Sequence, residues 1–298
     1  MEILFQQILN GLVQGSVYAL VALGYTMVYG ILGLINFAHG EVVMIGAMIA
    51  LTVLQALLVA AVAPVLAVLL SLLAAIVVCM ALGYSIERVA YRPLRNAPRV
   101  STIITALGVG LFLENFTLAL SPYPKHIPAL LTNTTWAIGS LSISSLQLII
   151  IVLSLVLMLI LDFVVQHTKA GMAMRAISWD KTIVPLMGVS VNKIISLTFA
   201  IGAGLGGAAG VMYGLAYPVI DPYMGIMVGW KAFICAVVGG IGNVRGAMIG
   251  GFILGAVEIM VGAFFPSTYR DFVAFTLLLV LLIVRPYGIL GKPQPQKV

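Results

Sequence analysis

Three ionisable residues lie inside strongly apolar stretches of the sequence: Glu114, Lys231 and Glu258. A charged side chain in a membrane costs about 3 kcal/mol or more, so such residues mark function or specific pairing. Lys231 and Glu258 occupy consecutive stretches, and at 1.5 Å of rise per residue their depths agree to within roughly 8 Å. We therefore predict a structural ion pair between Lys231 and Glu258, with contact to a small solute as the alternative.

A second polar group interrupts the apolar stretch GILGLINFAHGEVVMIGA: Asn36, His39 and Glu41, flanked by glycines that weaken a helix. One interpretation is a tight inner loop. The other is a broken helix near residues 33–41 that lines an aqueous cavity, where non-helical backbone is tolerated at membrane depth. Both stay open. We predict that Asn36, His39 and Glu41, together with Glu114, line or gate a polar path.

A glycine-rich interruption follows in VVGGIGNVRGAMIGGFILG, residues 237–255. Glycines four residues apart present bare backbone on one helix face, which favours close helix packing. A second helix break is predicted near residues 239–246.

The sequence contains no set of residues that would support catalysis. GILGKP near the C-terminal end lacks the spacing of a phosphate-binding loop, and GAGLGG at residues 202–207 follows no predicted strand. The cysteines, Cys79 and Cys235, lie in apolar stretches, and no Cys/His cluster has zinc-like spacing. We predict no catalytic residue, no metal and no cofactor in this chain, so energy from ATP would have to come from another chain.

The composition indicates a membrane protein, because 62% of the 298 residues are apolar and only 8% are charged. Soluble domains are about 45–50% apolar and about 25% charged. The apolar stretches do not alternate as barrel strands do, so we predict an all-α polytopic fold of about eight to ten membrane helices. Nine candidate spans are predicted, at residues 9–33, 42–60, 65–86, 101–120, 146–165, 195–215, 224–238, 247–264 and 271–284.

Basic residues set the predicted orientation. With nine spans, three basic clusters fall on one side of the membrane, and the positive-inside rule makes that side cytoplasmic. The orientation in the membrane therefore accounts for the net charge of +6, and we expect no nucleic-acid partner. The clusters are Arg88, Arg92, Arg95 and Arg99; Lys169, Arg175, Lys181 and Lys193; and Arg285, Lys292 and Lys297, joined by Arg245.

The longest inner connection, residues 166–194, contains a helix-compatible stretch, GMAMRAISWDKTIVPLMGV (residues 171–189). A structured inner loop of this length predicts a docking element for a soluble partner. The longest outer connection, residues 121–145, is predicted to be a loop.

Four segments of the chain resemble the permeases of branched-chain amino-acid ABC importers of the LivH type, and they occur in the same order as in that family. The first is GYTMVYGILGLINFAHGEVVMIGA, the N-terminal signature, and the second is YSIERVAYRPLR, the first basic inner loop. The third is KAFICAVVGGIGNVRGAMIGGFILGAVE, which carries Lys231 and Glu258 at its ends, and the fourth is RPYGILGK. The resemblance covers nearly the whole chain and implies one permease domain over residues 1–298.

The resemblance implies that residues 171–189 couple the chain to an ATPase. Ser178, Trp179 and Pro185 depart from the family pattern, and Pro185 removes a helical hydrogen bond, so an early helix end is expected. The residues that match the family's coupling segment are Gly171, Arg175, Ala176, Asp180, Leu186, Met187 and Gly188.

The resemblance further implies that the chain is not an enzyme but a multi-pass permease of the bacterial inner membrane, importing Leu, Ile, Val or similar amino acids by alternating access. Its expected partners are a second homologous permease, two ATP-binding subunits that hold ATP and Mg²⁺, and a periplasmic or lipid-anchored substrate-binding protein, besides the amino-acid substrate and membrane lipid. A urea or short-amide permease of the same architecture is one alternative. A stand-alone secondary transporter or channel is another.

Overall fold

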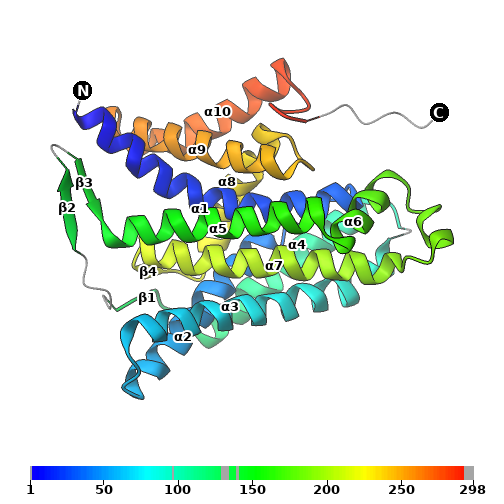
Figure 1. Ribbon diagram of the computed structural model, residues 1–298, viewed down its shortest axis with the longest axis horizontal. Helices are drawn as coiled ribbons and strands as arrows, with labels where there is room; N and C mark the ends of the chain where they lie inside the picture. The colour runs from blue at the N-terminus through cyan, green and yellow to red at the C-terminus, as the bar shows by residue number, and fades with distance from the viewer. Residues whose placement is uncertain (1, 96, 129–133, 139–140, 292–298) are drawn as a thin grey trace.

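The computed structural model describes residues 2–95, 97–128, 134–138 and 141–291 as a bundle of roughly parallel long helices (Figure 1). Each of the nine predicted spans falls on a helix, which confirms the all-α polytopic class. The helices are α1 (Glu2–Leu32), α2 (His39–Val59), α3 (Pro64–Ile86), α4 (Arg99–Leu120), α5 (Ser145–His167), α6 (Lys169–Trp179), α7 (Val191–Ala216), α8 (Met224–Gly239), α9 (Val244–Phe264) and α10 (Tyr269–Val284).

Seven helices in the described part of the chain are long and apolar enough to cross a membrane. They are α1 to α5, α7 and α9, whereas α8 and α10 each have 16 residues. α1 and α7 form the centre of the bundle, since 83% of the residues in their most apolar windows are buried, compared with 28% for α3, α4 and α5. The lipid-exposed helices are therefore apolar on both faces, as expected where lipid replaces water.

The outer connections contain short strands that the sequence analysis expected as loop. β1 (Lys125–His126) pairs antiparallel with β4 (Val219–Ile220), and β2 (Thr135–Ile138) pairs antiparallel with β3 (Leu141–Ser144). Both pairs lie at the same end of the bundle as the N-terminus (Figure 1). Outside the hydrocarbon region, backbone groups can pair between strands without the need for a closed barrel.

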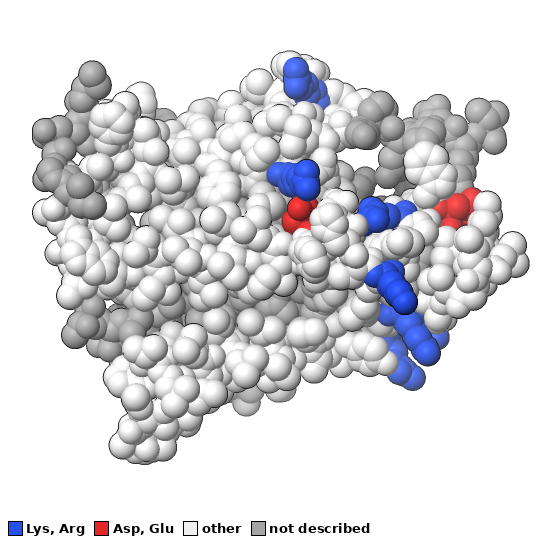
Figure 2. All heavy atoms as spheres, in the orientation of Figure 1, with Lys and Arg blue, Asp and Glu red and all other residues white. Residues whose placement is uncertain are grey.

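At the opposite end, α3 continues into a π-helical turn, η1 (Glu87–Tyr91), and a 3-10 turn, η2 (Arg92–Leu94). A further 3-10 turn, η3 (Val184–Met187), follows α6. Figure 2 shows that the Lys and Arg side chains visible on this face gather toward the same end, which we call the basic end. Lys292 and Lys297 of the predicted third cluster lie outside the described residues.

Bare glycine backbone holds α9 against both α1 and α8. A Cβ at Gly255 would lie 2.4 Å from the Cα of Gly15, and a Cβ at Gly251 would lie 2.5 Å from the Cα of Ala19. On the side facing α8, a Cβ at Gly250 would lie 2.0 Å from the carbonyl oxygen of Cys235. Because no side chain fits at these contacts, the helices pack through backbone dispersion contacts instead.

The two predicted interruptions are shorter than expected. Non-helical backbone covers residues 33–38 and 240–243, so His39 and Glu41 already belong to α2, and Val244 begins α9. Gly33 has φ +66° and Gly240 has φ +108°, values that favour glycine and let the chain reverse tightly. A Cβ at Gly24 would lie 2.1 Å from Nε2 of His39. Gly24 precedes the end of α1 by two helical turns, so α2 begins well inside the bundle.

A third interruption, at residues 217–223, lies between two predicted spans, but the depth at which the second of these helices begins was not predicted. α7 ends at Ala216, and the chain returns into the bundle before α8 begins at Met224. Gly225, in the first turn of α8, lies against the first turn of α2, because a Cβ at Gly40 would be 2.2 Å from its carbonyl oxygen. Farther along α2, Gly46 packs on Gly207 near the middle of α7. Two helix N-termini therefore meet deep inside the molecule.

We expect Gly255→Ala to lower the stability of the protein, because the added methyl would collide with the backbone of Gly15. Overpacking of this kind costs about 1–3 kcal/mol. Gly108→Ala in α4 is the matched control, since a Cβ there has no neighbour within 4 Å and alanine raises helix propensity by about 1 kcal/mol. The apparent melting temperature in detergent is the measurement, and equal values for both variants would contradict the packing argument.

Candidate functional site

The N-termini of α2 and α8 converge on the carboxyl group of Glu41. Glu41 is in the first turn of α2, and its carboxyl group lies directly on the backbone of Gly225, since a Cβ there would be 2.3 Å from Oε2. The positive end of a helix dipole stabilises a nearby anion. Glu41 Oε2 is buried and has no hydrogen-bond partner among the described residues. The site therefore contains a carboxylate oxygen that can still accept a hydrogen bond.

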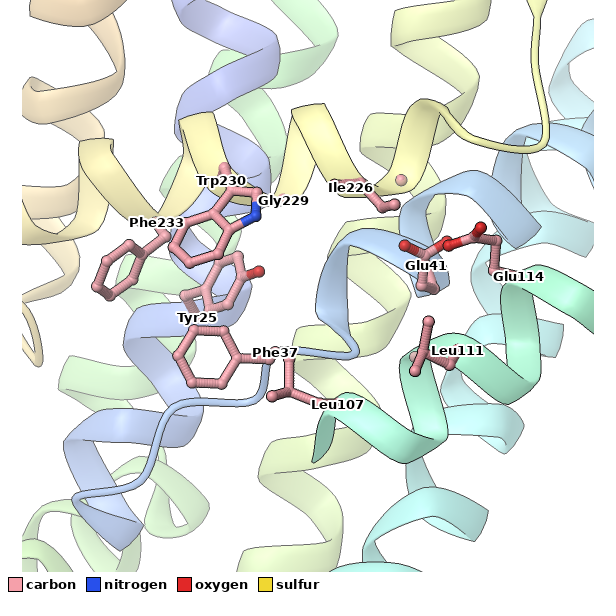
Figure 3. A pocket seen from close by; sticks show the side chains of 12 residues that line it. Tyr25, Phe37, Glu41, Leu107, Leu111, Glu114, Ile226, Gly229, Trp230 and Phe233 are labelled. Carbon is pink, nitrogen blue, oxygen red and sulfur yellow. The ribbon is translucent and has the colours of Figure 1, made fainter. Parts of the chain in front are cut away.

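A cavity of about 180 Å³ adjoins this carboxyl group, between α4 and α8. Glu114, from α4, also lines it, and Figure 3 shows the carboxyl groups of Glu41 and Glu114 pointing toward one another. The opposite part of the cavity is aromatic, formed by Tyr25, Phe37, Trp230 and Phe233. One compartment thus has an acidic end and an aromatic end.

Ring contacts among residues of three different segments form the aromatic end. The Phe37 ring, on the non-helical stretch after α1, lies 6.0 Å from that of Trp230 and 6.2 Å from that of Phe233. Tyr25 of α1 meets Phe233 edge to face at 6.4 Å. These are the spacings at which aromatic pairs attract. The sequence analysis missed all four residues, and the only available signal was the position of Phe37 beside Asn36 and of Trp230 beside Lys231.

The structure brings together two of the four residues predicted for the path, Glu41 and Glu114, and places the other two behind the cavity. Asn36 Oδ1 accepts hydrogen bonds from the Tyr91 hydroxyl at 2.8 Å and from the Ala38 N–H at 3.2 Å. The buried His39 ring packs on Tyr25, with centroids 4.9 Å apart. Asn36 and His39 therefore shape the helix break that positions Glu41, and neither lines the cavity.

Lys231 and Glu258 form the centre of a buried polar network. Lys231 Nζ lies 3.1 Å from Oε1 of Glu258, whose side chain is fully buried, and 2.9 Å from Asp271 Oδ1. Gln14 Nε2 and the Tyr18 hydroxyl each donate to Glu258 Oε2 at 2.8 Å. The two residues predicted as a pair are thus in contact. The sequence analysis did not anticipate Gln14, Tyr18 or Asp271, because nothing in the spacing indicates that α1 and α10 reach this point.

The segment predicted to couple to an ATPase is held by hydrogen bonds and close packing with the end of α5. Thr168 caps α6 by accepting from the Gly171 N–H at 3.1 Å, and a Cβ at Gly171 would meet the Val164 carbonyl at 2.3 Å. Arg175 donates through Nη1 to the carbonyl of Val165 at the end of α5. Four of the predicted residues, Gly171, Arg175, Asp180 and Gly188, thus have a backbone conformation or a hydrogen bond that explains their identity.

Asp180 and Gly188 form the turns of this segment. Asp180 Oδ1 accepts from the Thr182 N–H at 2.8 Å, and Gly188 has φ +79° after η3. α6 ends at Trp179, before Asp180 and six residues before Pro185, so Pro185 lies within η3 and does not terminate the helix.

The solvent side of the same segment is strongly apolar, although it lies beyond the helices that could cross a membrane. Leu186 is 86% exposed and Trp179 is 74% exposed; Ala176 is also exposed. Met172, Ile183 and Met187 extend the patch, which we call the α6–η3 patch. The sequence analysis did not single out Met172 or Ile183. Exposed apolar clusters rich in Trp and Met are typical of protein interfaces.

A polar contact joins this segment to the first helix break. Lys181 Nζ donates to the carbonyl oxygen of Leu32 at 3.1 Å, at the last residue of α1. The non-helical stretch that carries Asn36 and leads to Glu41 starts at the next residue. The α6–η3 patch and the cavity are therefore connected through a short, continuous set of backbone and side-chain contacts.

We expect Lys231→Met to destabilise the protein, because it leaves the fully buried Glu258 without its cation; breaking such a pair costs about 3–5 kcal/mol. Removing both charges in Lys231→Met/Glu258→Gln should restore much of the loss. Asp271→Asn is the milder comparison, since Asp271 is 46% exposed. Unfolding in mixed detergent micelles measures this, and a double variant less stable than the single one would show that the pair is not the cause.

Comparison with known proteins places the chain in a family. The family model described as branched-chain amino acid transport system / permease component matches residues 7–282. The permease protein LivH of a high-affinity branched-chain amino acid transport system in Salmonella typhimurium is 44% identical over 98% of this chain and 97% of its own length. The corresponding BraD of Pseudomonas aeruginosa is 46% identical over the same shares.

A probable branched-chain amino acid transport permease protein LivH of Methanocaldococcus jannaschii is 27% identical over 96% of this chain and 92% of its own length. No solved structure gives a significant match. The relatives are transport components and not enzymes, and the helices described above make this a multi-pass membrane protein. The chain belongs to the family of permease components of branched-chain amino acid transport systems.

Proposed function

We propose that this chain is the membrane-spanning subunit of an ATP-driven importer that carries Leu, Ile, Val or similar amino acids into the cytoplasm of a bacterium, across the inner membrane. The observation that supports this most directly is the cavity with carboxylates at one end and aromatic rings at the other. It matches a small zwitterion that carries an ammonium group and an apolar side chain.

The chemistry of each end suits one part of such a substrate. Glu41 and Glu114 would attract the ammonium group, while Phe37 and Trp230 would receive the branched side chain. The N-termini of α2 and α8 would favour the substrate carboxylate, as helix ends at broken helices do in other transporters. Urea has neither a cation nor a branched side chain, so the aromatic end favours amino acids over the urea or short-amide alternative.

The open side of the cavity supports a second, homologous permease as partner. Trp230 is 41% exposed and Leu111 is 59% exposed where the cavity opens between α4 and α8. Two carboxyl groups so near a lipid-facing opening would be costly. A second permease covering α4 and α8 would enclose the path between the two subunits and allow it to open to one side at a time.

The α6–η3 patch supports coupling to ATP-binding subunits, which would hold the ATP and Mg²⁺. A soluble partner that grips Leu186 and Trp179 would move Lys181, and through its bond to Leu32 the first helix break. The break in turn positions Glu41. Neither a secondary transporter nor a channel needs such an exposed apolar patch, and this disfavours the stand-alone alternative. A periplasmic or lipid-anchored binding protein would deliver substrate at the opposite end.

We expect Glu41→Gln to reduce amino-acid uptake about 10- to 100-fold, because a hydrogen bond to a charged group contributes about 1.5–3 kcal/mol. Glu114→Gln should act in the same direction. Asp162→Asn in α5 is the charge-matched control, since its partner Arg245 is 66% exposed and such pairs contribute little. Uptake into vesicles reconstituted with the whole importer is the measurement. Normal uptake by the Glu41→Gln/Glu114→Gln variant would exclude this cavity from the path.

We expect Leu186→Ala to weaken binding of the ATP-binding subunits, because truncating an apolar residue at the centre of an interface costs about 1–2 kcal/mol or more. Trp179→Ala should have a larger effect. Leu159→Ala in α5 provides the control, as Leu159 is 57% exposed but lies on a helix that could cross the membrane. Co-purification and substrate-stimulated ATP hydrolysis report the outcome. Full retention of the ATP-binding subunits by Trp179→Ala/Leu186→Ala would refute the docking assignment.

A further inference from the structure

A basic hollow lies at the basic end of the bundle, apart from the cavity and from the α6–η3 patch. It has a volume of about 490 Å³ and is formed by the end of α3, the turns that follow it, and the start of α7. Three cations line it, Arg88, Arg92 and Lys193. All three are exposed, and none forms an ion pair with a described residue.

The carboxylate next to Arg88 in the sequence, Glu87, does not neutralise these cations. Glu87 is fully buried, and its two carboxyl oxygens are taken by Arg95 and by the hydroxyl of Ser196. No acidic side chain is among the residues that line the hollow. The hollow therefore presents an uncompensated positive charge, which is the property of an anion-binding site.

The lining changes from cationic to apolar with depth into the bundle, along both helices. On α7, Lys193 is in the first turn, while Leu197 and Ala200 follow one and two turns deeper. On the α3 side, Arg88 lies one turn beyond Tyr84, donates to its hydroxyl at 2.6 Å and sits over its ring at 5.9 Å. Tyrosine and arginine in this arrangement are typical of the membrane–water interface.

Beyond the hollow, the outer surface of α3 is apolar. Leu69, Leu73 and Val77 on this helix are 54%, 57% and 55% exposed, and α3 is among the least buried helices of the bundle. A molecule with its anionic group among the three cations could therefore extend an acyl chain along α3 without meeting a polar group. A free inorganic anion would use only the cationic half of the hollow.

We propose that this hollow binds the headgroup of an anionic phospholipid of the cytoplasmic leaflet, with Arg92 and Lys193 on the phosphate and Tyr84 and Leu197 against the start of the acyl chains. The site ties the end of α3 to the start of α7. The same turns carry Tyr91, which donates to Asn36 in the helix break, so the lipid holds in place the inner support of that break.

The test uses the full-length chain, purified in detergent, stripped of lipid and titrated with phosphatidylglycerol or phosphatidylcholine while bound lipid is counted by native mass spectrometry. Arg92→Gln/Lys193→Gln is compared with Lys125→Gln/Arg285→Gln, which removes the same charge outside the hollow. Each basic residue at a membrane surface contributes about fivefold in affinity for anionic lipid. We expect the first variant to bind phosphatidylglycerol about 30-fold more weakly, and the control to match the unmodified chain within about twofold.

Three results would overturn the proposal. Equal retention of phosphatidylglycerol and phosphatidylcholine would show that charge plays no part. Displacement of phosphatidylglycerol by inorganic phosphate at equal concentration would indicate a soluble-anion site. Unchanged lipid affinity in Arg92→Gln/Lys193→Gln, together with loss of the ATP-binding subunits on co-purification, would assign the hollow to a protein interface.

Discussion

The contact between Gly40 of α2 and Gly225 of α8 is the constraint on which the site depends. In hydrocarbon, a helix cannot end unless its free backbone groups are shielded from lipid. Here two helices begin inside the bundle, and their first turns shield one another because neither glycine has a side chain. A methyl group at Gly40 would separate the two N-termini, and one at Gly225 would displace the carboxyl group of Glu41 from the backbone on which it lies.

The bundle contains two kinds of buried carboxylate, and their surroundings differ in a way that separates structure from function. Glu258 has a cation and two hydrogen-bond donors within reach, supplied by α1 and α8. Glu41 faces another carboxyl group, and its Oε2 is left without a partner among the described residues. A buried polar group without a partner costs more than it returns in stability, so Glu41 is the one that fits a role toward a ligand, whereas Glu258 fits a role in packing.

The inner connections also contain residues that hold the structure together and residues that face outward. In the α6–η3 segment, Gly171, Arg175 and Asp180 make contacts within the chain, while Trp179 and Leu186 face outward. The contacts of Lys181 with Leu32 and of Tyr91 with Asn36 reach the same helix break from two sides. Two hydrogen bonds therefore link the inner connections to the residues that lead into α2.

Most of the fold follows from the sequence alone. Apolar runs located nine of the ten described α-helices, the exception being α6. The glycine spacing in α9 indicated close packing, and the charges of Lys231 and Glu258 predicted their contact. The order of four motifs identified the family. These features are local, or depend on neighbouring helices, so one sequence is enough to recognise them.

Only the tertiary structure decided which residues meet at the cavity. Tyr25, Glu114 and Trp230 meet there although they come from α1, α4 and α8, which are far apart in the sequence. The depth at which α8 begins left no mark in the apolar pattern. In a membrane protein, the faces that contact lipid and the faces that contact other helices are both apolar. Hydropathy therefore shows that a segment lies in the membrane, but not which of its faces packs against which neighbour.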